Sequence, residues 1–428
     1  MKLVKSLLLG TAAGLCAAAG VQAADLPSKK AAAVEYVRVC STLGEGFFYI
    51  PGTETCVKIG GRVRADYLYA EPLTRAADAI GFRARGRLQV DARTTTAYGL
   101  LRAVVRMEIT RNSGTPFTDT GRITTSPDVA QAFIQFGGLT AGRVTTFFDN
   151  SDLPTEHMGT LRFSDSPDVD LLAYTFTFGN GFSATLSIED GLERRSNGFL
   201  DAASVATLNY AGQRAPDVVG ALKYTGTWGT AQLSAALHQI RSNNVFVSPL
   251  TGISDFPDTD YGFAVQGSVG VNLPMLGEGD AAWINLVYAD GALSYITGGS
   301  TDTLNAGVLA GLLVDGYINP LTGNISTGRG WSVAGGLRHY WTPTIRQSVF
   351  GSYARFEYSA SATQFGIADF NELRLGGNVI WSPVSGLDIG AEVIYARVDP
   401  RGRVTLANGQ TYGSDDSWEG RLRVQRDF

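Results

Sequence analysis

The chain has 428 residues, with 40 acidic against 35 basic side chains, a net charge of −5 and a mean hydropathy close to zero. This acidic balance excludes a general electrostatic attraction to nucleic acid. After residue 23 the sequence contains no apolar run of the ~18 residues that a transmembrane helix needs, which excludes such a helix there.

Residues 1–23 have the pattern of a signal peptide. Lys2 and Lys5 give a positive start, residues 7–19 are apolar, and Val21-Gln22-Ala23 offers a small-residue cleavage site. Cleavage there removes two lysines and moves the net charge from −5 to −7. We therefore predict that the protein is exported.

Residues 24–56 form a predicted periplasmic segment ahead of the first long strand. Cys40 and Cys56 are the two cysteines beyond residue 23, and the periplasm is oxidising, so we expect them to form a disulfide. Residues 24–33 are rich in Ala and Lys and predict a passive linker. An alternative hypothesis is that Ala24-Asp25 or Lys29-Lys30 contacts peptidoglycan.

From residue 57 to the end, apolar and polar residues alternate with period two, which is typical of strands. In residues 79–93, for example, Phe82, Leu88 and Val90 share one face, while Arg83 and Arg85 share the other. The strand-like runs contain 9 to 16 residues. That length exceeds the usual globular strand and matches a tilted strand that crosses a membrane.

Loop lengths predict the topology, since outer-membrane barrels alternate short periplasmic turns with long external loops. Tight turns are expected at 95–96, 137–138, 180, 228–229, 342–343 and 385–386, and long loops at 112–128, 148–168, 191–216, 242–259, 291–328, 359–369 and 399–415. Placing 202–210 inside the fourth long loop preserves this alternation. The prediction is an all-β fold, a 16-stranded antiparallel transmembrane β-barrel over 57–428, with strands at 57–70, 79–94, 97–111, 129–137, 139–147, 169–179, 181–190, 217–228, 230–241, 260–273, 280–290, 329–342, 344–358, 370–382, 386–398 and 416–428.

The aromatic residues agree with a membrane barrel in the outer membrane. Four tryptophans fall near predicted periplasmic strand ends and two near external ends, which suggests two aromatic girdles: Trp228, Trp283, Trp341 and Trp381, then Trp331 and Trp418. Phe428 closes an alternating strand and resembles the signal by which the barrel-assembly machinery recognises its clients.

Several motifs resemble the alphaproteobacterial porin family. They are GFFYIPG at 46–52, CVKIGG at 56–61, AFIQF at 132–136, Gly142-Arg143 followed by FFD at 147–149, PDVVG at 216–220 and WGTAQLSAA at 228–236. The resemblance implies a homotrimer of sixteen-stranded barrels in the bacterial outer membrane, passive diffusion of small hydrophilic solutes and ions, and a third external loop folded into the pore as a constriction.

The candidate site residues are charges that would face the pore. The first three strands carry many inward cations against three inward carboxylates, Asp66, Asp91 and Glu108. We predict a constriction formed by Arg62, Arg64, Arg83, Arg85, Arg87, Arg102 and Arg106, facing Asp149, Asp152, Glu156 and Asp165 of the third loop, with Asp168 beside them. Pairing about the turns predicts that Arg64 lies opposite Arg85 and Arg62 opposite Arg87. It also predicts that Arg85 lies opposite Arg106.

The alternatives are a substrate-specific channel, a gated transporter, a barrel enzyme and a secreted β-sandwich. No Gly-x-Ser-x-Gly motif occurs, and His157 and His238 are the histidines that an enzyme could use. Residues 277–282 resemble a dinucleotide motif but predict a turn, and Asp255, Asp258 and Asp260 depart from calcium-loop spacing. We therefore predict no enzyme activity, no cofactor and no metal site.

Overall fold

The computed structural model describes residues 38–428, apart from 73–74, 76, 115–116, 119–120, 197–207, 248–251, 253, 299–312, 320–321, 363–366, 402–403 and 406–410. The predicted signal peptide and linker, 1–33, lie outside the described residues. Residues 40–428 form one folded unit, to which the following description refers. In the described part of the chain, no helix is both long and apolar enough to cross a membrane.

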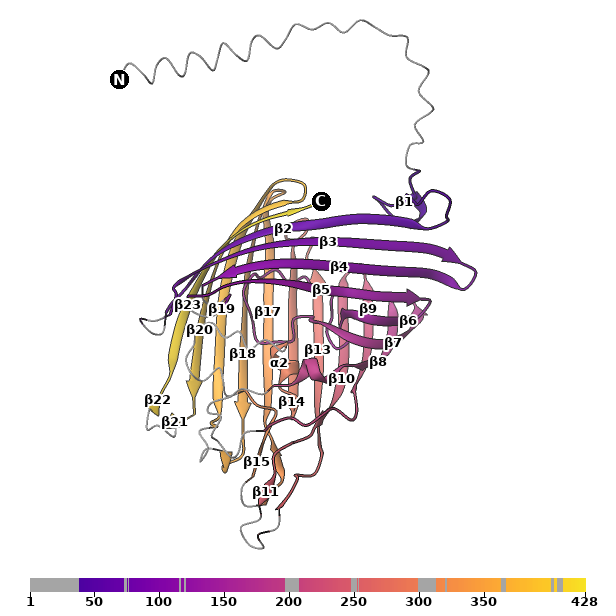
Figure 1. Cartoon of the computed structure of the whole chain (residues 1–428). Helices are drawn as coiled ribbons and strands as arrows, with labels where there is room; N and C mark the ends of the chain where they lie inside the picture. The colour runs from indigo at the N-terminus through magenta and orange to yellow at the C-terminus, as the bar shows by residue number, and fades with distance from the viewer. Residues whose placement is uncertain are drawn as a thin grey trace, which may run out of the picture. The chain divides into compact units, whose positions relative to one another are not determined.

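Sixteen antiparallel strands close into a barrel, because the first strand pairs with both the second and the last (Figure 1). In ring order they are β2 (Cys56–Ala70), β3 (Ile80–Thr96), β4 (Gly99–Ser113), β5 (Ile123–Phe136), β6 (Leu139–Thr145), β7 (Asp168–Gly179), β8 (Phe182–Glu189), β9 (Asp217–Gly226), β10 (Gly229–Ile240), β13 (Asp260–Asn272), β14 (Ala281–Asp290), β17 (Arg329–Thr342), β18 (Ile345–Glu357), β19 (Phe370–Val384), β20 (Leu387–Pro400) and β23 (Asp415–Asp427). Pairing of the first strand with the last closes the ring, which is how a barrel avoids a free sheet edge.

Each predicted strand corresponds to one observed strand, and the prediction of sixteen is confirmed. The largest error in a boundary is at β5, which begins at Ile123 rather than 129. Polar residues with Pro127 suggested a loop there, but residues 123–129 continue the strand with largely exposed side chains. Pro127 pairs with Ile109 three residues after a register shift at Arg106/Met107, where the ladder is irregular.

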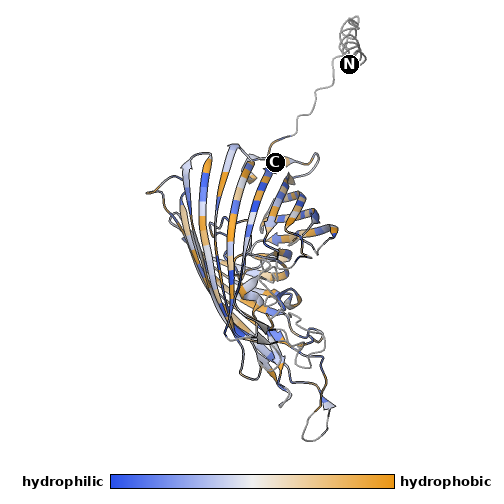
Figure 2. Ribbon diagram, turned by 90° about the vertical axis from the view of Figure 1, so that its left-hand side faces the viewer, coloured by the Kyte–Doolittle hydropathy of each residue, from blue (hydrophilic) through white to orange (hydrophobic). Residues whose placement is uncertain are grey.

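Hydrophobic and hydrophilic residues alternate along the strands (Figure 2), and their burial assigns the apolar ones to the outer face of the barrel and the polar ones to the inner face. On β10 the side chains of Leu233 and Leu237 are 61% and 57% exposed, whereas Ser234 and His238 are 3% and 1% exposed. In a soluble protein such leucines would be buried. Exposed apolar side chains that alternate with buried polar ones around a closed barrel are the pattern of a membrane-spanning β-barrel.

The aromatic girdles are only partly as predicted. Trp228, Trp341 and Trp381 lie outward near periplasmic ends and are 44%, 64% and 48% exposed. Trp283 departs from the prediction. It points inward, is 6% exposed and packs with its ring 5.2 Å from that of Phe163. The reason is its register: Trp283 shares a face with the buried Ala281 and Val287, so it belongs to the lumen.

Short elements decorate this barrel. A 3-10 helix (Ser41–Leu43) and β1 (Phe48–Tyr49) lie in the segment closed by the predicted Cys40–Cys56 disulfide, which is present. A second 3-10 helix (Gly191–Arg194) and α2 (Ser294–Thr297) lie in external loops. Three two-stranded ribbons extend other loops, formed by β11 (Phe246–Val247) with β12 (Ser254–Asp255), β15 (Gly316–Ile318) with β16 (Ile325–Thr327), and β21 (Val404–Thr405) with β22 (Thr411–Tyr412).

Candidate functional site

Seven arginines of β2, β3 and β4 form one charged inner surface, which we call the arginine wall: Arg62, Arg64, Arg83, Arg85, Arg87, Arg102 and Arg106. The period-two pattern places them on the same face, and the cross-strand pairs are Arg62 with Arg87 and Arg64 with Arg85, as predicted. Like charges directly opposite destabilise a sheet. Glu108 offsets part of this repulsion, because its carboxylate lies 3.2 Å from Arg85 and 2.5 Å from Arg87.

The predicted pairing of Arg85 with Arg106 is wrong. Arg85 lies opposite Thr110, and Arg106 lies opposite Gln89. The hairpin turns at 97–98 instead of 95–96, because Thr96 pairs with Gly99 and its hydroxyl donates to the Gly99 carbonyl at 2.6 Å. The partners on β4 therefore shift by four positions, and Arg64, Arg85 and Arg106 do not lie abreast.

Polar partners hold the remaining arginines of the wall. Arg62 pairs with Asp427 at 2.5 Å, and Arg64 Nε donates to the Gln425 side chain at 2.9 Å. Arg102 pairs with Asp91 at 2.9 Å, and Arg83 lies 3.9 Å from Asp66. Since β23 closes the barrel beside β2, the last strand thus supplies partners for the first. Neither spacing nor composition could have predicted the two partners on β23, Asp427 and Gln425, without the closure.

Residues 146–167, between β6 and β7, form loop 3, which folds into the barrel. Phe148 is fully buried, and its carbonyl accepts hydrogen bonds from Gln232 and Gln266, at 3.0 Å each. Farther along the loop, the carbonyl of Glu156 accepts from Asn378 at 2.7 Å. Because these partners lie on β10, β13 and β19, loop 3 lines the inner face of the later strands, away from the arginine wall.

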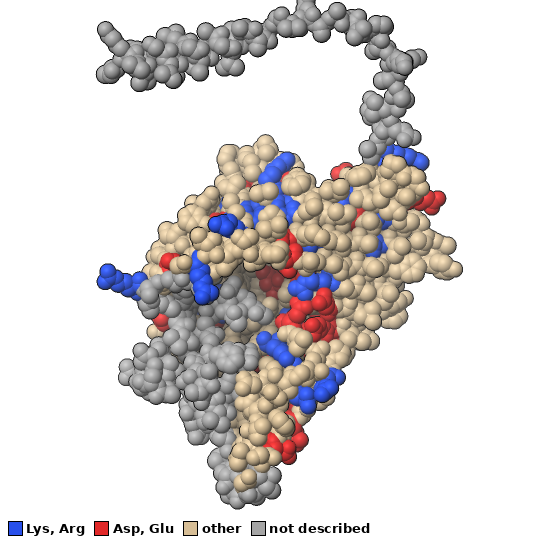
Figure 3. Space-filling model, in the orientation of Figure 1, with Lys and Arg blue, Asp and Glu red and all other residues tan. Residues whose placement is uncertain are grey.

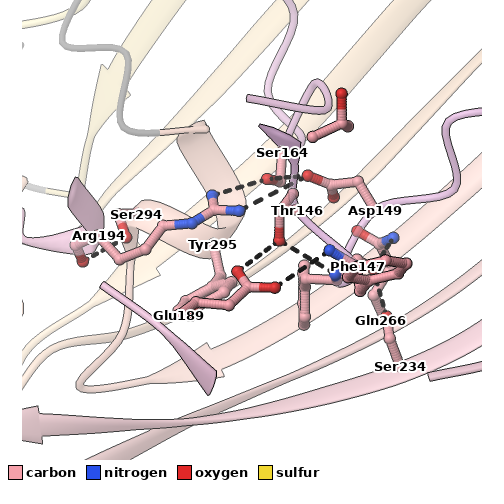
Figure 4. A network of polar contacts seen from close by, with 12 residues as sticks. Thr146, Phe147, Asp149, Ser164, Glu189, Arg194, Ser234, Gln266, Ser294 and Tyr295 are labelled. Atoms are coloured by element: carbon pink, nitrogen blue, oxygen red, sulfur yellow. Dashed lines mark hydrogen bonds and ion pairs between the residues drawn. The ribbon is translucent and has the colours of Figure 1, made fainter. Parts of the chain in front are cut away.

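The base of loop 3 is held by a buried polar network around Arg194 (Figure 4). The Arg194 guanidinium donates to Ser164 at 3.0 Å and lies 3.8 Å from the Asp149 carboxylate, which accepts from the same serine at 2.6 Å. Glu189 accepts from the Thr146 hydroxyl at 2.7 Å. Burial raises the pKa of Asp149 to about 7, with Arg194 and Ser164 opposing the rise. The network thus ties loop 3 to the neighbouring external loop.

The returning half of loop 3, after Glu156, is held by a buried charge triad. Arg162 and Arg374 flank Glu372 at 2.7 and 2.5 Å, and all three side chains are at most 1% exposed. Sequence reasoning missed Arg162, Glu372 and Arg374. The period-two pattern of β19 places Glu372 and Arg374 on its inner face, but nothing local indicates that a loop residue would join them.

The predicted acidic residues of loop 3 lie in different environments. Asp149 is buried, and Glu156 pairs with Arg346 at 2.5 Å. Asp152 and Asp165 have side chains that are 46% and 54% exposed; Asp152 pairs with Lys223 at 2.9 Å, and Asp165 lies 3.8 Å from His157. Asp168, at the start of β7, lies 4.0 Å from Arg106, where the acidic and basic groups come together.

On the face shown in Figure 3, basic and acidic side chains gather around the hollowed centre. Within the described residues, Asp170, Asp190 and Glu193 place carboxylate oxygens within 4.8 Å of one another. Arg143 lies 2.7 Å from Glu193, so the positive charge beside these three carboxylates comes from a guanidinium.

His238 pairs with Asp217 at 2.9 Å and is 1% exposed, so a substrate in the lumen cannot reach its ring.

Comparisons with known proteins agree with this arrangement. The model of the porin subfamily matches residues 25–421. Porin Omp2b of Brucella canis and of Brucella abortus are each 30% identical over 439 residues, which cover 99% of both chains. The outer-membrane channel DcaP of Acinetobacter baumannii is 15% identical, with a TM-score of 0.62 over 89% of this chain and 99% of that one. A trimer form of Vibrio cholerae OmpT has a TM-score of 0.50 at 11% identity, over 88% of this chain and 100% of that one.

These solved structures share the fold, and the relatives extend the likeness to the whole sequence. An apolar outer face and a polar, charged lumen are typical of an outer-membrane barrel that passes solutes. The chain belongs to the porin subfamily, as an outer-membrane channel for solutes.

Proposed function

We propose that this porin passes small hydrophilic solutes and ions by passive diffusion, and that its narrowest part lies between the arginine wall and loop 3. The observation that carries the proposal is the position of loop 3. It lines one side of the lumen with Asp152 and Asp165 exposed, while the arginine wall lines β2 to β4. A charged, water-filled lumen favours small polar solutes, because apolar ones must displace oriented water.

The arginine wall carries a surplus of positive charge, whereas loop 3 offers the exposed carboxylates of Asp165 and of Asp152, the latter paired with Lys223, and this asymmetry would create a field across the channel. The Arg106–Asp168 contact, at 4.0 Å, marks where the two sides meet. Charged groups in a narrow pore act at close range and are only partly screened by salt. Cations are therefore favoured along the acidic side and anions along the basic side. We infer from the family that the protein acts as a channel rather than as an enzyme; of the two histidines considered for catalysis, His157 packs against Phe350 and lies 3.8 Å from Asp165, and His238 pairs with Asp217.

The test is the ion selectivity of a variant that carries Arg64→Gln, Arg85→Gln and Arg106→Gln together. Removal of three positive charges from the wall should shift the reversal potential in a KCl gradient toward cation selectivity. The matched control is Arg355→Gln on β18. Arg355 lies opposite the outward-facing Trp331, so its replacement should leave the reversal potential unchanged. An unaltered reversal potential in the triple variant would show that the wall does not set selectivity.

We also propose that the protein assembles as a homotrimer. The support is the trimer form of the structurally similar Vibrio cholerae OmpT, together with the family resemblance. Native mass measurement in mild detergent should give three copies per particle, and a single copy would contradict the proposal.

We propose as well that Phe428 is recognised by the barrel-assembly machinery. In support, this terminal residue is 66% exposed.

A further inference from the structure

We propose that the channel binds small organic anions bearing phosphate or carboxylate groups in a basic cavity at the periplasmic end of β2, β3 and β4. The cavity has a volume of about 460 Å³, within the usual range of small-molecule sites. It lies where the short turns are, beside the final residue of β23 and the disulfide-closed segment. This inference rests on the proposed passive channel, since it adds a binding station to that path.

The lining carries more cations than carboxylates. Its charged side chains are Lys58, Arg62, Arg87, Arg93, Arg102 and Arg106, against the carboxylates of Asp91 and Asp427. Asp91 serves two guanidiniums at once, Arg93 at 2.8 Å and Arg102 at 2.9 Å. One carboxylate neutralises one charge, so this group of three keeps a net positive charge.

Arg106 is the least neutralised of the arginines in the lining. Its Nε donates to the neutral side chain of Gln89 at 2.9 Å, and the carboxylate of Asp168 lies 4.0 Å from its Nη1. Its side chain is 22% exposed and that of Arg102 is 26% exposed, so both reach the cavity. A guanidinium has five N–H donors, and those left over suit the oxygens of a phosphate or a carboxylate.

The exposed ring of Phe428 gives the cavity apolar surface for the carbon skeleton of an organic anion, whereas the Phe47 ring is only 4% exposed and packs against the Arg93 guanidinium. Phe428 lies at one edge, and Phe47 of the disulfide-closed segment lies at another. The Phe47 ring is 4.5 Å from the Arg93 guanidinium, which donates to the Leu43 carbonyl at 3.1 Å. The disulfide-closed segment 40–56 is therefore a wall of the site. Inorganic chloride would contact only the cationic side chains of the cavity and would gain nothing from its apolar surface.

The experiment is single-channel recording in KCl with a small anion added from the periplasmic side. Glycerol 3-phosphate and malonate are the probes, and glycerol is the neutral control. Both anions should reduce the conductance in a saturable manner, and glycerol should not. In the Arg102→Gln/Arg106→Gln variant the half-blocking concentration should rise about tenfold, because charge-assisted hydrogen bonds are lost.

The matched control is Arg338→Gln, which removes an arginine at the periplasmic end of β17, outside the lining. The half-blocking concentrations of the two anions should be the same for this variant as for the wild type. If the double variant fails to fold, Lys58→Gln alters an exposed lining residue and should raise the half-blocking concentration by a smaller factor. Block by glycerol 3-phosphate alone would restrict the site to phosphates and support it.

Equal block of wild type and lining variants, or equal block by glycerol, would overturn the proposal. These results differ from failure of the channel itself, which would show as an absence of conductance in KCl alone.

Discussion

At the scale of single residues, the inner surface is held by charges that share partners. Each of three carboxylates forms ion pairs with two arginines: Glu108 with Arg85 and Arg87, Asp91 with Arg93 and Arg102, and Glu372 with Arg162 and Arg374. A lumen built from ion pairs with a surplus of one sign keeps its side chains ordered while leaving donors for solutes. This arrangement explains how opposed arginines are tolerated across β2 and β3.

The raised pKa of Asp149 implies that the stability of the folded protein depends on pH. Its pKa is about 7 in the folded protein, well above the unfolded value, so folding takes up a proton between about pH 4 and 7. The stabilisation is complete at the acidic end of this window and is lost as the pH rises through it. Relative to Asp149→Asn, the wild type should lose at most about 1.4 kcal/mol per pH unit. Guanidinium unfolding of both proteins at several pH values measures this, and a constant difference would contradict it.

Gly61 lies where the first and last strands meet, and there is no room for a larger side chain at this position. It exchanges two backbone hydrogen bonds with Phe428, at 2.9 and 3.0 Å. A Cβ there would lie 2.6 Å from the Arg87 carbonyl oxygen and would overlap the Phe428 ring. Gly61→Ala should therefore destabilise the closure by about 1–3 kcal/mol. The readout is the temperature at which the folded barrel unfolds on detergent gels. Gly86→Ala, where a Cβ has open space, is the control, and equal temperatures would contradict the account.

At the scale of elements, loop 3 is positioned by both of its ends and by its middle. The Arg194 network holds the base, and the Arg162–Glu372–Arg374 triad holds the segment beyond Glu156. A loop bound at several points can narrow a channel steadily, whereas a loop held only at its ends would fluctuate.

Glu372→Gln should loosen loop 3, because it removes the carboxylate that lies between two buried guanidiniums. Loss of such a partner typically costs about 3–5 kcal/mol. Open-channel current noise should increase, and the unfolding midpoint should fall. Glu357→Gln is the matched control. Its ion pairs are more exposed and individually weak, so it should cost about 1 kcal/mol or less. Quiet channels in Glu372→Gln would show that the triad does not hold the loop.

The elements were predictable because the membrane imposes a simple rule. Lipid on one side and water on the other enforce period two along each strand, and the alternation of short and long connections fixes the count. The turn at 97–98 escaped prediction because Thr95 and Thr96 suit a turn as well as a strand, and in the structure they continue β3. The two-residue shift of the turn moves every partner on β4 by four positions. The inward Trp283 escaped because an aromatic residue near a strand end suits either face.

At the scale of the whole molecule, the site was predictable only in part. The arginine wall follows from the pattern of three neighbouring strands, so its face could be read from residues alone. Asp149 and Glu156 could not be placed, because a loop has no period that tells a buried carboxylate from an exposed one. Contacts between β2 and β23, or between Arg162 and Glu372, join residues hundreds of positions apart and exist only once the barrel closes.

The central claim is that this barrel encloses an open, charged aqueous path. Single-channel recording in a planar bilayer, with the KCl concentration varied, tests it most directly. The account predicts stepwise ohmic openings whose conductance rises with salt concentration, and a reversal potential that moves toward cations when Arg64, Arg85 and Arg106 are replaced by glutamine. A correctly folded barrel that conducts no current would contradict the account.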